Sequence, residues 1–294
     1  MEYGVSSVKC RGEDDVSSFT FPVSRYNPHV PKRNVIPVAL TIAGSDSGGG
    51  AGIQADLKTF ASLGVHGTAA ITSITAQNPS TITAIQPCKP EIVRRQIEAV
   101  FSGFRPRAAK TGMLYSAEII RTVVQFFRRN PSELVVDPVM VSTSGVTLLK
   151  ASARKVLMEQ LLPLASLVMP NLPEAEILLG TKIESPEELR QAAKTIQKRF
   201  GCPALVKGGH LARLKVSIDF FWDGKQELLL SAPLVRGIRT HGTGCVYSAA
   251  VTAYLAGGCS LAVAVQKGKQ YITESIAVSG KTRKFSILGV PRMT

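Results

Sequence analysis

The fold is decided by one stretch near the start of the folded region, Val38-Ala39-Leu40-Thr41-Ile42-Ala43-Gly44-Ser45-Asp46-Ser47-Gly48-Gly49-Gly50-Ala51-Gly52. Residues 38–42 form a short, β-branched apolar run that is typical of a buried strand, and a glycine-rich loop follows it directly. The next residues predict a helix that Gly64 ends, with an apolar face made of Ile53, Leu57, Phe60 and Ala61. A strand, a loop and a helix in this order are the repeating unit of a parallel sheet.

The same alternation continues from Pro37 to about residue 280. A second helix has clear ends, because Ser185 can cap it, Glu188 completes a capping box and Gly201 stops it. No interior linker or repeat stands out. We therefore expect one α/β domain over residues 35–294, with a central, mostly parallel sheet flanked by helices on both faces.

Composition and charge narrow the class of protein. The 294 residues are 45% hydrophobic and 19% charged, as in a folded globular protein, and no stretch reaches the roughly 18 uncharged apolar residues of a membrane span. Residues 1–34 lack apolar periodicity and are rich in Ser, Pro and charge, which predicts a loose N-terminal extension. The five cysteines are odd in number and form no CxxC pair, which favours reduced thiols in a cytoplasmic protein over disulfides or a zinc site.

The chain is strongly basic, with a formal net charge of +14 from 35 Lys and Arg against 21 Asp and Glu. Such a surplus attracts nucleic acid, anionic membranes or phosphorylated small molecules, and charge alone does not choose among them. The basic residues are spread along the chain instead of forming one block. The simplest interpretation is therefore a solvated basic surface.

Polar or glycine-rich residues follow directly on six apolar strand patterns. In a parallel sheet all such junctions lie along the carboxyl edge, where ligands of open α/β proteins bind. We therefore expect the junctions to converge on one cleft. They are Ala43 to Asp46, Ala76 to Asn78, Lys110 to Met113, Asp137-Pro138, Pro170-Asn171 and Lys207 to Gly209.

The first glycine-rich loop, residues 45–52, lets the backbone approach a ligand closely, and we favour a ligand role over a merely tight turn. It is not a Walker A loop, because no Lys-Ser/Thr pair follows the glycines. Asp56, in the first turn of the next helix, is at least as well explained as a solvated or dipole-compensating acid.

The second glycine-rich segment is Thr240-His241-Gly242-Thr243-Gly244-Cys245, and an apolar helical run follows it. Its glycines and the positive end of the helix dipole predict a hole for an anion, although a small residue packed at a helix start is the alternative. The same field would lower the pKa of the Cys245 thiol and favour the thiolate. We interpret His241 as structural.

In combination these segments resemble the hydroxymethylpyrimidine/phosphomethylpyrimidine kinases of thiamine biosynthesis, which have the ribokinase-like fold. The resemblance extends from residue 37 to about residue 278 in unbroken order. It is carried by Ala43 to Asp56, Thr75 to Asn78, Lys110 to Leu114, Asp137 to Met140, Pro170 to Glu176, Val206 to His210 and His241 to Cys245.

The resemblance implies phosphoryl transfer from ATP, with Mg²⁺, to the hydroxymethyl group of a 4-amino-2-methylpyrimidine and then to the monophosphate formed. Cys245 would be the base, and Gly242, Thr243 and Gly244 would hold the transferring phosphoryl group. Gln77 would hydrogen-bond the aminopyrimidine edge, because an amide offers both a donor and an acceptor. The other implied site residues are Gly44, Asp56 and Met113 for the pyrimidine, Lys207, Gly208, Gly209 and Thr240 for the nucleotide, and Asp137 and Glu174 for the metal.

The chain departs from this family at Val146, where an acidic residue is frequent, and in its basic C-terminal tail, where glycines are usual. Pyridoxal kinases are the nearest alternative, because they share the glycine-rich loop and the Gly-Thr-Gly turn. A basic nucleic-acid-binding or ligand-sensing protein on a kinase-like scaffold is a further alternative, disfavoured by the 6% aromatic content. We expect neither a nucleic acid nor a membrane as partner; homodimers are common among such kinases. The kinase interpretation requires Cys245 and Gln77 to share one cavity.

Overall fold

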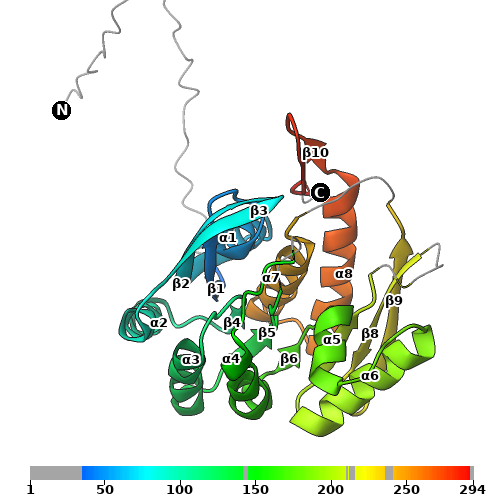
Figure 1. Ribbon diagram of the computed structural model, residues 1–294, viewed down its shortest axis with the longest axis horizontal. Coiled ribbons are helices and arrows are strands. Elements are labelled where there is room, and N and C mark those ends of the chain that lie inside the picture. The colour runs from blue at the N-terminus through cyan, green and yellow to red at the C-terminus, as the bar shows by residue number, and fades with distance from the viewer. Residues whose placement is uncertain (1–34, 142–144, 210, 212–215, 236–240, 292–294) are drawn as a thin grey trace, which may run out of the picture. The chain divides into compact units, whose positions relative to one another are not determined.

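The computed structural model describes residues 35–141, 145–209, 211, 216–235 and 241–291, and within these residues nine strands form one sheet (Figure 1). Their order across the sheet is β3-β2-β1-β4-β5-β6-β7-β8-β9. The strands are β1 (Val38–Asp46), β2 (His66–Asn78), β3 (Thr81–Pro87), β4 (Ala108–Thr111), β5 (Glu133–Val136), β6 (Leu167–Val168), β7 (Ala204–Lys207), β8 (Val216–Trp222) and β9 (Glu227–Pro233).

Six neighbouring strands of this sheet are parallel, from β2 through β1, β4, β5 and β6 to β7. These are the strands that the six apolar runs predict, so the junctions that follow them lie along one edge. The antiparallel strand β3 extends the sheet at one end, and β8 and β9 extend it at the other. The prediction of a mostly parallel α/β sheet is therefore confirmed.

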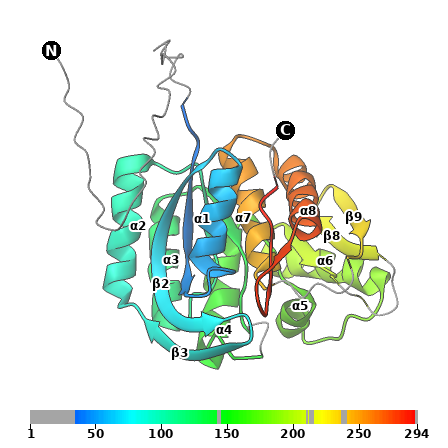
Figure 2. The same ribbon diagram turned by 90° about the horizontal axis from the view of Figure 1, so that it is seen from above.

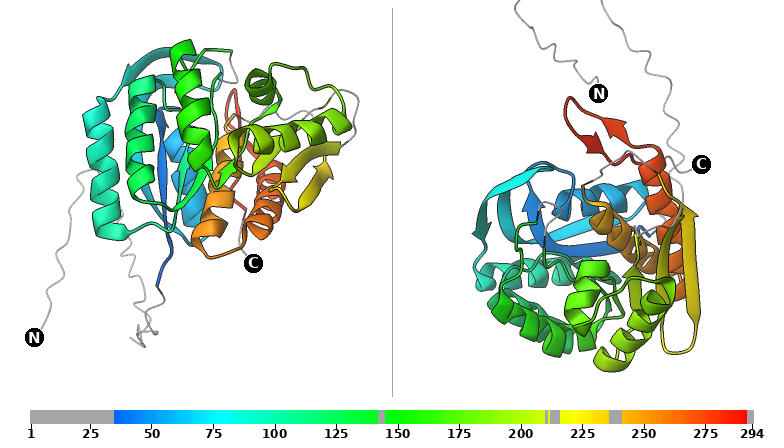
Figure 3. Two further views of the ribbon diagram at one scale, coloured as in Figure 1. Left: turned by 90° about the horizontal axis from the view of Figure 1, so that it is seen from below. Right: turned by 45° about the vertical axis from the view of Figure 1, so that its right-hand side comes forward.

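Helices cover both faces of the sheet, as Figures 2 and 3 show. Helices α2 to α6 pack on one face, and α1, α7 and α8 pack on the other. Side chains alternate between the two faces along a strand, so Leu40 and Ile42 join the first core while Ala39 joins the second. The helices are α1 (Gly52–Ser62), α2 (Pro90–Phe104), α3 (Ala117–Arg129), α4 (Ala151–Val156), α5 (Leu172–Leu179), α6 (Pro186–Phe200), α7 (Thr243–Ala256) and α8 (Leu261–Ala277).

The start of α6 has the capping box that the sequence predicts. The Ser185 side chain accepts from the Glu188 N–H, the Glu188 carboxylate accepts from the Ser185 N–H, and Gly201 ends the helix with φ at 74°. A second capping box, formed by Asn171 and Glu174, starts α5. Glu174 therefore has a local structural role besides the one implied for it.

The apolar face predicted for α1 needs one correction. Ile53 and Phe60 are buried, but Ala61 is exposed. Eight residues after Ile53 the helix has turned by about 80° away from that face, and Asp56 lies in the buried stripe instead. A carboxylate thus occupies a position that packing alone would give to an apolar side chain.

Residues 36–294 form one compact unit. Among the described helices, none is both long and apolar enough to cross a bilayer. A short hairpin of β10 (Gly280–Lys281) and β11 (Ser286–Ile287) follows α8. The loose extension predicted for residues 1–34 lies outside the described residues.

Candidate active site

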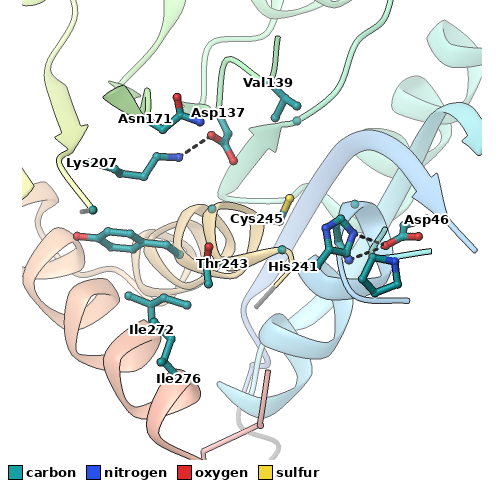
Figure 4. Close-up of a pocket in the computed structure, with 18 of the residues that line it drawn as sticks. Asp46, Asp137, Val139, Asn171, Lys207, His241, Thr243, Cys245, Ile272 and Ile276 are labelled. Atoms are coloured by element: carbon teal, nitrogen blue, oxygen red, sulfur yellow. Dashed lines mark hydrogen bonds and ion pairs between the residues drawn. The ribbon is translucent and has the colours of Figure 1, made fainter. Parts of the chain in front are cut away.

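One large cleft runs along the carboxyl edge of the parallel strands and has a volume of about 1780 Å³ (Figure 4). Among the predicted site residues that the structure describes, all except Gly208 line it. Cys245 and Gln77 therefore share one cavity, as the kinase interpretation requires. The predicted residues that line the cleft are Gly44, Asp56, Gln77, Met113, Asp137, Glu174, Lys207, Gly209, Gly242, Thr243, Gly244 and Cys245.

Gly208, which is predicted for the nucleotide, is not part of this lining. Thr240, also predicted for the nucleotide, lies outside the described residues. The Gly208 N–H donates to Asp219 Oδ1 at 3.1 Å, so this amide already has an acceptor. A Cβ at Gly208 would collide with the carbonyl oxygen of Ile218, which explains why glycine is needed there. The geometry gives Gly208 a packing role.

The Gly242–Cys245 turn has the geometry of an anion hole. Gly242 has a φ of 87°, and a Cβ at this position would collide with the carbonyl oxygen of Gly50. Helix α7 begins at Thr243, so the N–H groups of its first turn have no acceptor within the helix. The turn lines the cleft, and the positive end of the helix dipole lies at the same place.

Cys245 differs from its prediction. Burial raises the pKa of its thiol to about 11, which is the opposite of the predicted direction, so the group is a neutral thiol near pH 7 and the predicted thiolate is wrong. Lys110 lowers the pKa, but burial and the nearby carboxylates of Asp56 and Asp137 outweigh it. The loss of solvent around the sulfur therefore decides the direction of the pKa shift.

The first glycine-rich loop directs its backbone inward. The Asp46 carboxylate accepts from the N–H groups of Gly48 at 2.8 Å, Gly50 at 3.2 Å and Ala51 at 2.9 Å. Burial raises the pKa of Asp46, but the hydrogen bonds from His241 and from the loop bring it below its usual value. These three N–H groups therefore already have an acceptor within the loop. A ligand would be contacted by side chains and by the few loop residues that line the cleft.

A hydrogen-bonded chain joins this loop to the anion turn. His241 Nε2 lies 3.0 Å from Asp46 Oδ2 and 3.0 Å from the Gln77 side-chain amide, as Figure 4 shows for the first contact. Gln77 in turn lies 3.0 Å from Thr75 Oγ1. The sequence interpretation of His241 as structural did not include a link between the two glycine-rich segments.

A buried ion pair forms the floor of the cleft. Lys110 Nζ donates to Asp56 Oδ1 at 2.7 Å, Thr41 Oγ1 donates to Asp56 Oδ2 at 2.6 Å, and the Lys110 and Asp56 side chains are fully buried. The interpretation of Asp56 as a solvated acid is therefore wrong. Burial lowers the pKa of Lys110, but the carboxylates around it raise it above its usual value. The sequence analysis gave Lys110 no role, although a lysine inside a buried strand is itself a signal.

Asp137 and Glu174 line the cleft near the anion turn. Asp137 accepts from Lys207 Nζ at 2.9 Å and from Ser248 Oγ at 3.1 Å. The pKa of Glu174 is raised to about 7, because burial raises it more than the charge of Lys207 lowers it, and the charge of Asp137 adds to the increase. No group of three metal-binding side chains occurs among the described residues. Two carboxylates fit Mg²⁺, which usually takes one or two from the protein and completes its shell with phosphate and water.

The far end of the cleft is lined by α7 and α8 and is more apolar. Ile272 and Ile276 line it (Figure 4), together with Tyr247. The buried Tyr247 hydroxyl has no hydrogen-bond partner among the described residues. Nearby, Lys269 Nζ donates to Asp219 Oδ2 at 2.7 Å. The sequence analysis missed these residues, although Lys269 falls on the buried face of α8.

The basic C-terminal tail also reaches the cleft. The β10–β11 hairpin lines it with three exposed cations, Lys281, Arg283 and Lys284. The departure noted in the sequence therefore places positive charge at the solvent margin of the cleft. Such charge favours the approach of an anionic ligand.

Comparisons with known proteins agree with this geometry. The sequence matches the phosphomethylpyrimidine kinase family over residues 46–287. The hydroxymethylpyrimidine/phosphomethylpyrimidine kinase of Rhizobium meliloti is 46% identical over 245 residues, which are 83% of this chain and 92% of that protein.

Two solved structures resemble the fold closely. The phosphomethylpyrimidine kinase of Clostridium difficile is 43% identical with a TM-score of 0.72, over 82% of this chain and 99% of that one. An ADP complex of Bacillus subtilis pyridoxal kinase is 35% identical with a TM-score of 0.81, over 87% of this chain and 98% of that one. A phosphomethylpyrimidine kinase and a pyridoxal kinase thus share this fold.

Proposed function

The chain belongs to the phosphomethylpyrimidine kinase family, and from this premise we propose that its cleft transfers the terminal phosphoryl group of ATP to 4-amino-5-hydroxymethyl-2-methylpyrimidine and then to the resulting monophosphate. The enzyme is a phosphotransferase of thiamine biosynthesis. The observation that carries the proposal is the common cleft of Gln77, which can read an aminopyrimidine edge, and the Gly242–Cys245 turn, which can hold a phosphoryl group.

Phosphoryl transfer needs positioning and neutralisation of charge more than covalent help. The N–H groups at the start of α7 would stabilise the oxygens of the transferring group. The substrate hydroxyl oxygen forms the new bond to phosphorus as the bond to ADP breaks, and its proton goes to the Cys245 sulfur. Burial raises the pKa of Cys245 to about 11, so the thiol must lose its proton before it can act as the base, and the charge of Lys110 favours that loss.

Nucleotide and metal sites follow from the same edge of the sheet. The apolar end at Ile272 and Ile276 would receive the base of ATP, and Lys207 and Gly209 would lie along its phosphates. Asp137 and Glu174 would hold Mg²⁺, which supplies positive charge to the phosphate oxygens when it is bound. Met113 and Gly44 would complete the pyrimidine pocket with Asp56.

Pyridoxal is the second candidate acceptor, because pyridoxal kinases are close structural neighbours at 35% identity. The higher identity to hydroxymethylpyrimidine/phosphomethylpyrimidine kinases favours the pyrimidine. A homodimer and a cytoplasmic location stay predictions.

An ATP assay with three separate acceptors tests the proposal. Hydroxymethylpyrimidine and its monophosphate should each produce ADP, and pyridoxal should be used with a lower kcat/KM. Each product is identified by mass, and reactions without Mg²⁺ serve as controls. Turnover of pyridoxal alone would overturn the proposed acceptor, and phosphorylation of hydroxymethylpyrimidine without that of its monophosphate would overturn the second step.

A further inference from the structure

We propose that the β10–β11 hairpin is a phosphate-binding arm of the cleft, in which Lys281, Arg283 and Lys284 contact the phosphate groups of the bound nucleotide from the solvent side. The inference rests on the proposed kinase function for the identity of the ligand. It adds to the nucleotide site a segment that lies outside every motif quoted from the sequence.

Without the hairpin, the cleft is lined by more negative than positive groups. Five carboxyl groups and three lysines line it among the described residues. Even when Glu174, with its pKa of about 7, is protonated, the carboxylates outnumber the lysines. A nucleotide with several negative charges is repelled by such a lining unless further positive charge is supplied. The groups are those of Asp46, Asp56, Asp137, Glu174 and Asp219, and of Lys110, Lys207 and Lys269.

Each of the three lysines also has a carboxylate partner already. The Nζ–Oδ distances are 2.7 Å for Lys110 with Asp56, 2.9 Å for Lys207 with Asp137 and 2.7 Å for Lys269 with Asp219. The field of an ammonium group is largely cancelled at a distance by a carboxylate in contact with it. These lysines therefore attract a phosphate group less than their number suggests.

The hairpin supplies cations that have no such partner. Lys281, Arg283 and Lys284 are exposed and line the cleft, and none of them forms an ion pair with a described residue. Their charge can therefore act on a ligand. With these three cations included, the described lining carries more positive than negative groups.

The position of the hairpin favours the nucleotide as this ligand. The hairpin follows α8 directly (Figure 1). The last turns of α8 line the cleft with Ile272, Thr273 and Ile276, at the end where we place the base of ATP. The hairpin therefore continues the wall of the cleft that would hold the base.

Main-chain hydrogen bonds hold the hairpin in one shape. The Thr282 N–H donates to the Phe285 carbonyl oxygen at 2.8 Å and closes the turn. The Gly289 N–H donates to the Ser275 carbonyl oxygen at 3.2 Å, which ties the returning chain to α8. The two cationic side chains at the tip take no part in these bonds, so they can be replaced without loss of the hairpin.

Binding measurements without an acceptor test the phosphate-binding arm. Arg283→Gln/Lys284→Gln should weaken ATP and ADP binding by about 5-fold to 20-fold at low salt, the combined value of two exposed charge pairs, and adenosine binding by less than about 2-fold. At about 0.5 M NaCl the loss for ATP should shrink to about 2-fold, because salt screens exposed charges. Isothermal titration calorimetry of the 294-residue chain at one fixed Mg²⁺ concentration gives the three Kd values.

Two further variants are matched controls. Arg283→Lys/Lys284→Arg keeps both charges and should bind ATP within about 2-fold of the natural chain. Arg128→Gln/Arg129→Gln removes two exposed cations from the last turn of α3, which do not line the cleft, and should leave ATP binding unchanged. An equal loss in this α3 variant, or an equal loss for adenosine and ATP in the hairpin variant, would overturn the proposal.

The monophosphate of the pyrimidine is the other source of phosphate oxygens in the cleft. With saturating ATP, Arg283→Gln/Lys284→Gln should change its KM by less than about 2-fold, because a distant exposed charge contributes little. A raised KM for the monophosphate with unchanged ATP binding would overturn the assignment to the nucleotide. If ATP binding responds as expected but hydroxymethylpyrimidine is not phosphorylated, the proposed acceptor fails and the phosphate-binding arm stands.

Discussion

The two segments of the cleft are both rich in glycine but differ in which groups accept hydrogen bonds from their backbone N–H groups. In the first loop, residues 45–52, three N–H groups donate to the carboxylate of Asp46. In the second turn, residues 242–245, no described residue accepts a hydrogen bond from the N–H groups of Thr243, Gly244 or Cys245. The N–H groups of the first loop therefore bind the Asp46 carboxylate, whereas those of the second turn are available to an anionic ligand.

The difference teaches that glycine content does not by itself mark a phosphate site. What matters is whether the released N–H groups already have an acceptor. A carboxylate placed two to five residues before them satisfies the first loop locally, and hydrogen bonds to a charged group are worth about 1.5–3 kcal/mol each. The second turn has no such residue and starts a helix of 14 residues, which adds its dipole.

Replacement of Cys245 should have the largest effect on the second turn. Cys245→Ala and Cys245→Ser should lower kcat by about 10²-fold to 10⁴-fold, the range of a positioned base, without unfolding the chain. Initial rates with saturating ATP and hydroxymethylpyrimidine measure the loss. Cys259→Ala is the control, because Cys259 does not line the cleft. Near-normal turnover in the Cys245 variants would show that this thiol is not the base.

Alanine at a left-handed glycine in each segment sharpens the comparison. Gly242→Ala forces a left-handed backbone and a collision with the Gly50 carbonyl, so it should cost about 4 kcal/mol. Gly49 has a similar φ of 70°, but its Cβ would meet only the flexible end of Lys58 at 3.5 Å, so Gly49→Ala should cost about 1 kcal/mol. Urea unfolding measures both. Equal costs would mean that the two segments are not in backbone contact.

Much of this arrangement could be predicted from the sequence because its signals are local. Short β-branched runs predicted the six parallel strands, and Ser185, Glu188 and Gly201 predicted both ends of α6. The glycine pattern predicted two turns at the correct edge. The Asp46 acceptor was also a local signal, since the N–H groups that it binds follow within five residues, and the sequence analysis did not use it.

The remaining features depend on contacts between residues far apart in the chain. Lys110 and Asp56 are 54 residues apart, and their pairing converts an acid interpreted as solvated into part of the cleft floor. The pKa of Cys245 depends mainly on how much water the surrounding helices and strands exclude from the sulfur. A short sequence motif does not predict that burial. The antiparallel strands β8 and β9 were not predicted, although the residues Val216 to Trp222 have the β-branched and aromatic composition of a strand.

The carboxylates beside the two segments give the last comparison. Asp46 is satisfied and its pKa lies below the usual value, whereas the pKa of Glu174 is raised from 4.5 to about 7. Between pH 4.5 and about pH 7, Glu174 therefore keeps its proton in the folded chain but has lost it in the unfolded chain. Stability should therefore fall as pH rises from 4.5 to 7, by about 3 kcal/mol at most, and this contribution should be constant outside that window.

Glu174→Gln isolates this contribution, because glutamine keeps the capping box at the start of α5 but does not titrate. The difference in unfolding free energy between the natural chain and Glu174→Gln, measured by urea in a chelating buffer, should change across pH 4.5 to 7. Glu188→Gln changes the matching capping box of α6, where the exposed Glu188 has a lowered pKa, so its difference should stay constant over the same range. A flat profile for Glu174→Gln would mean that Glu174 is as well satisfied as Asp46, and the contrast between the two segments would then be confined to their backbone amides.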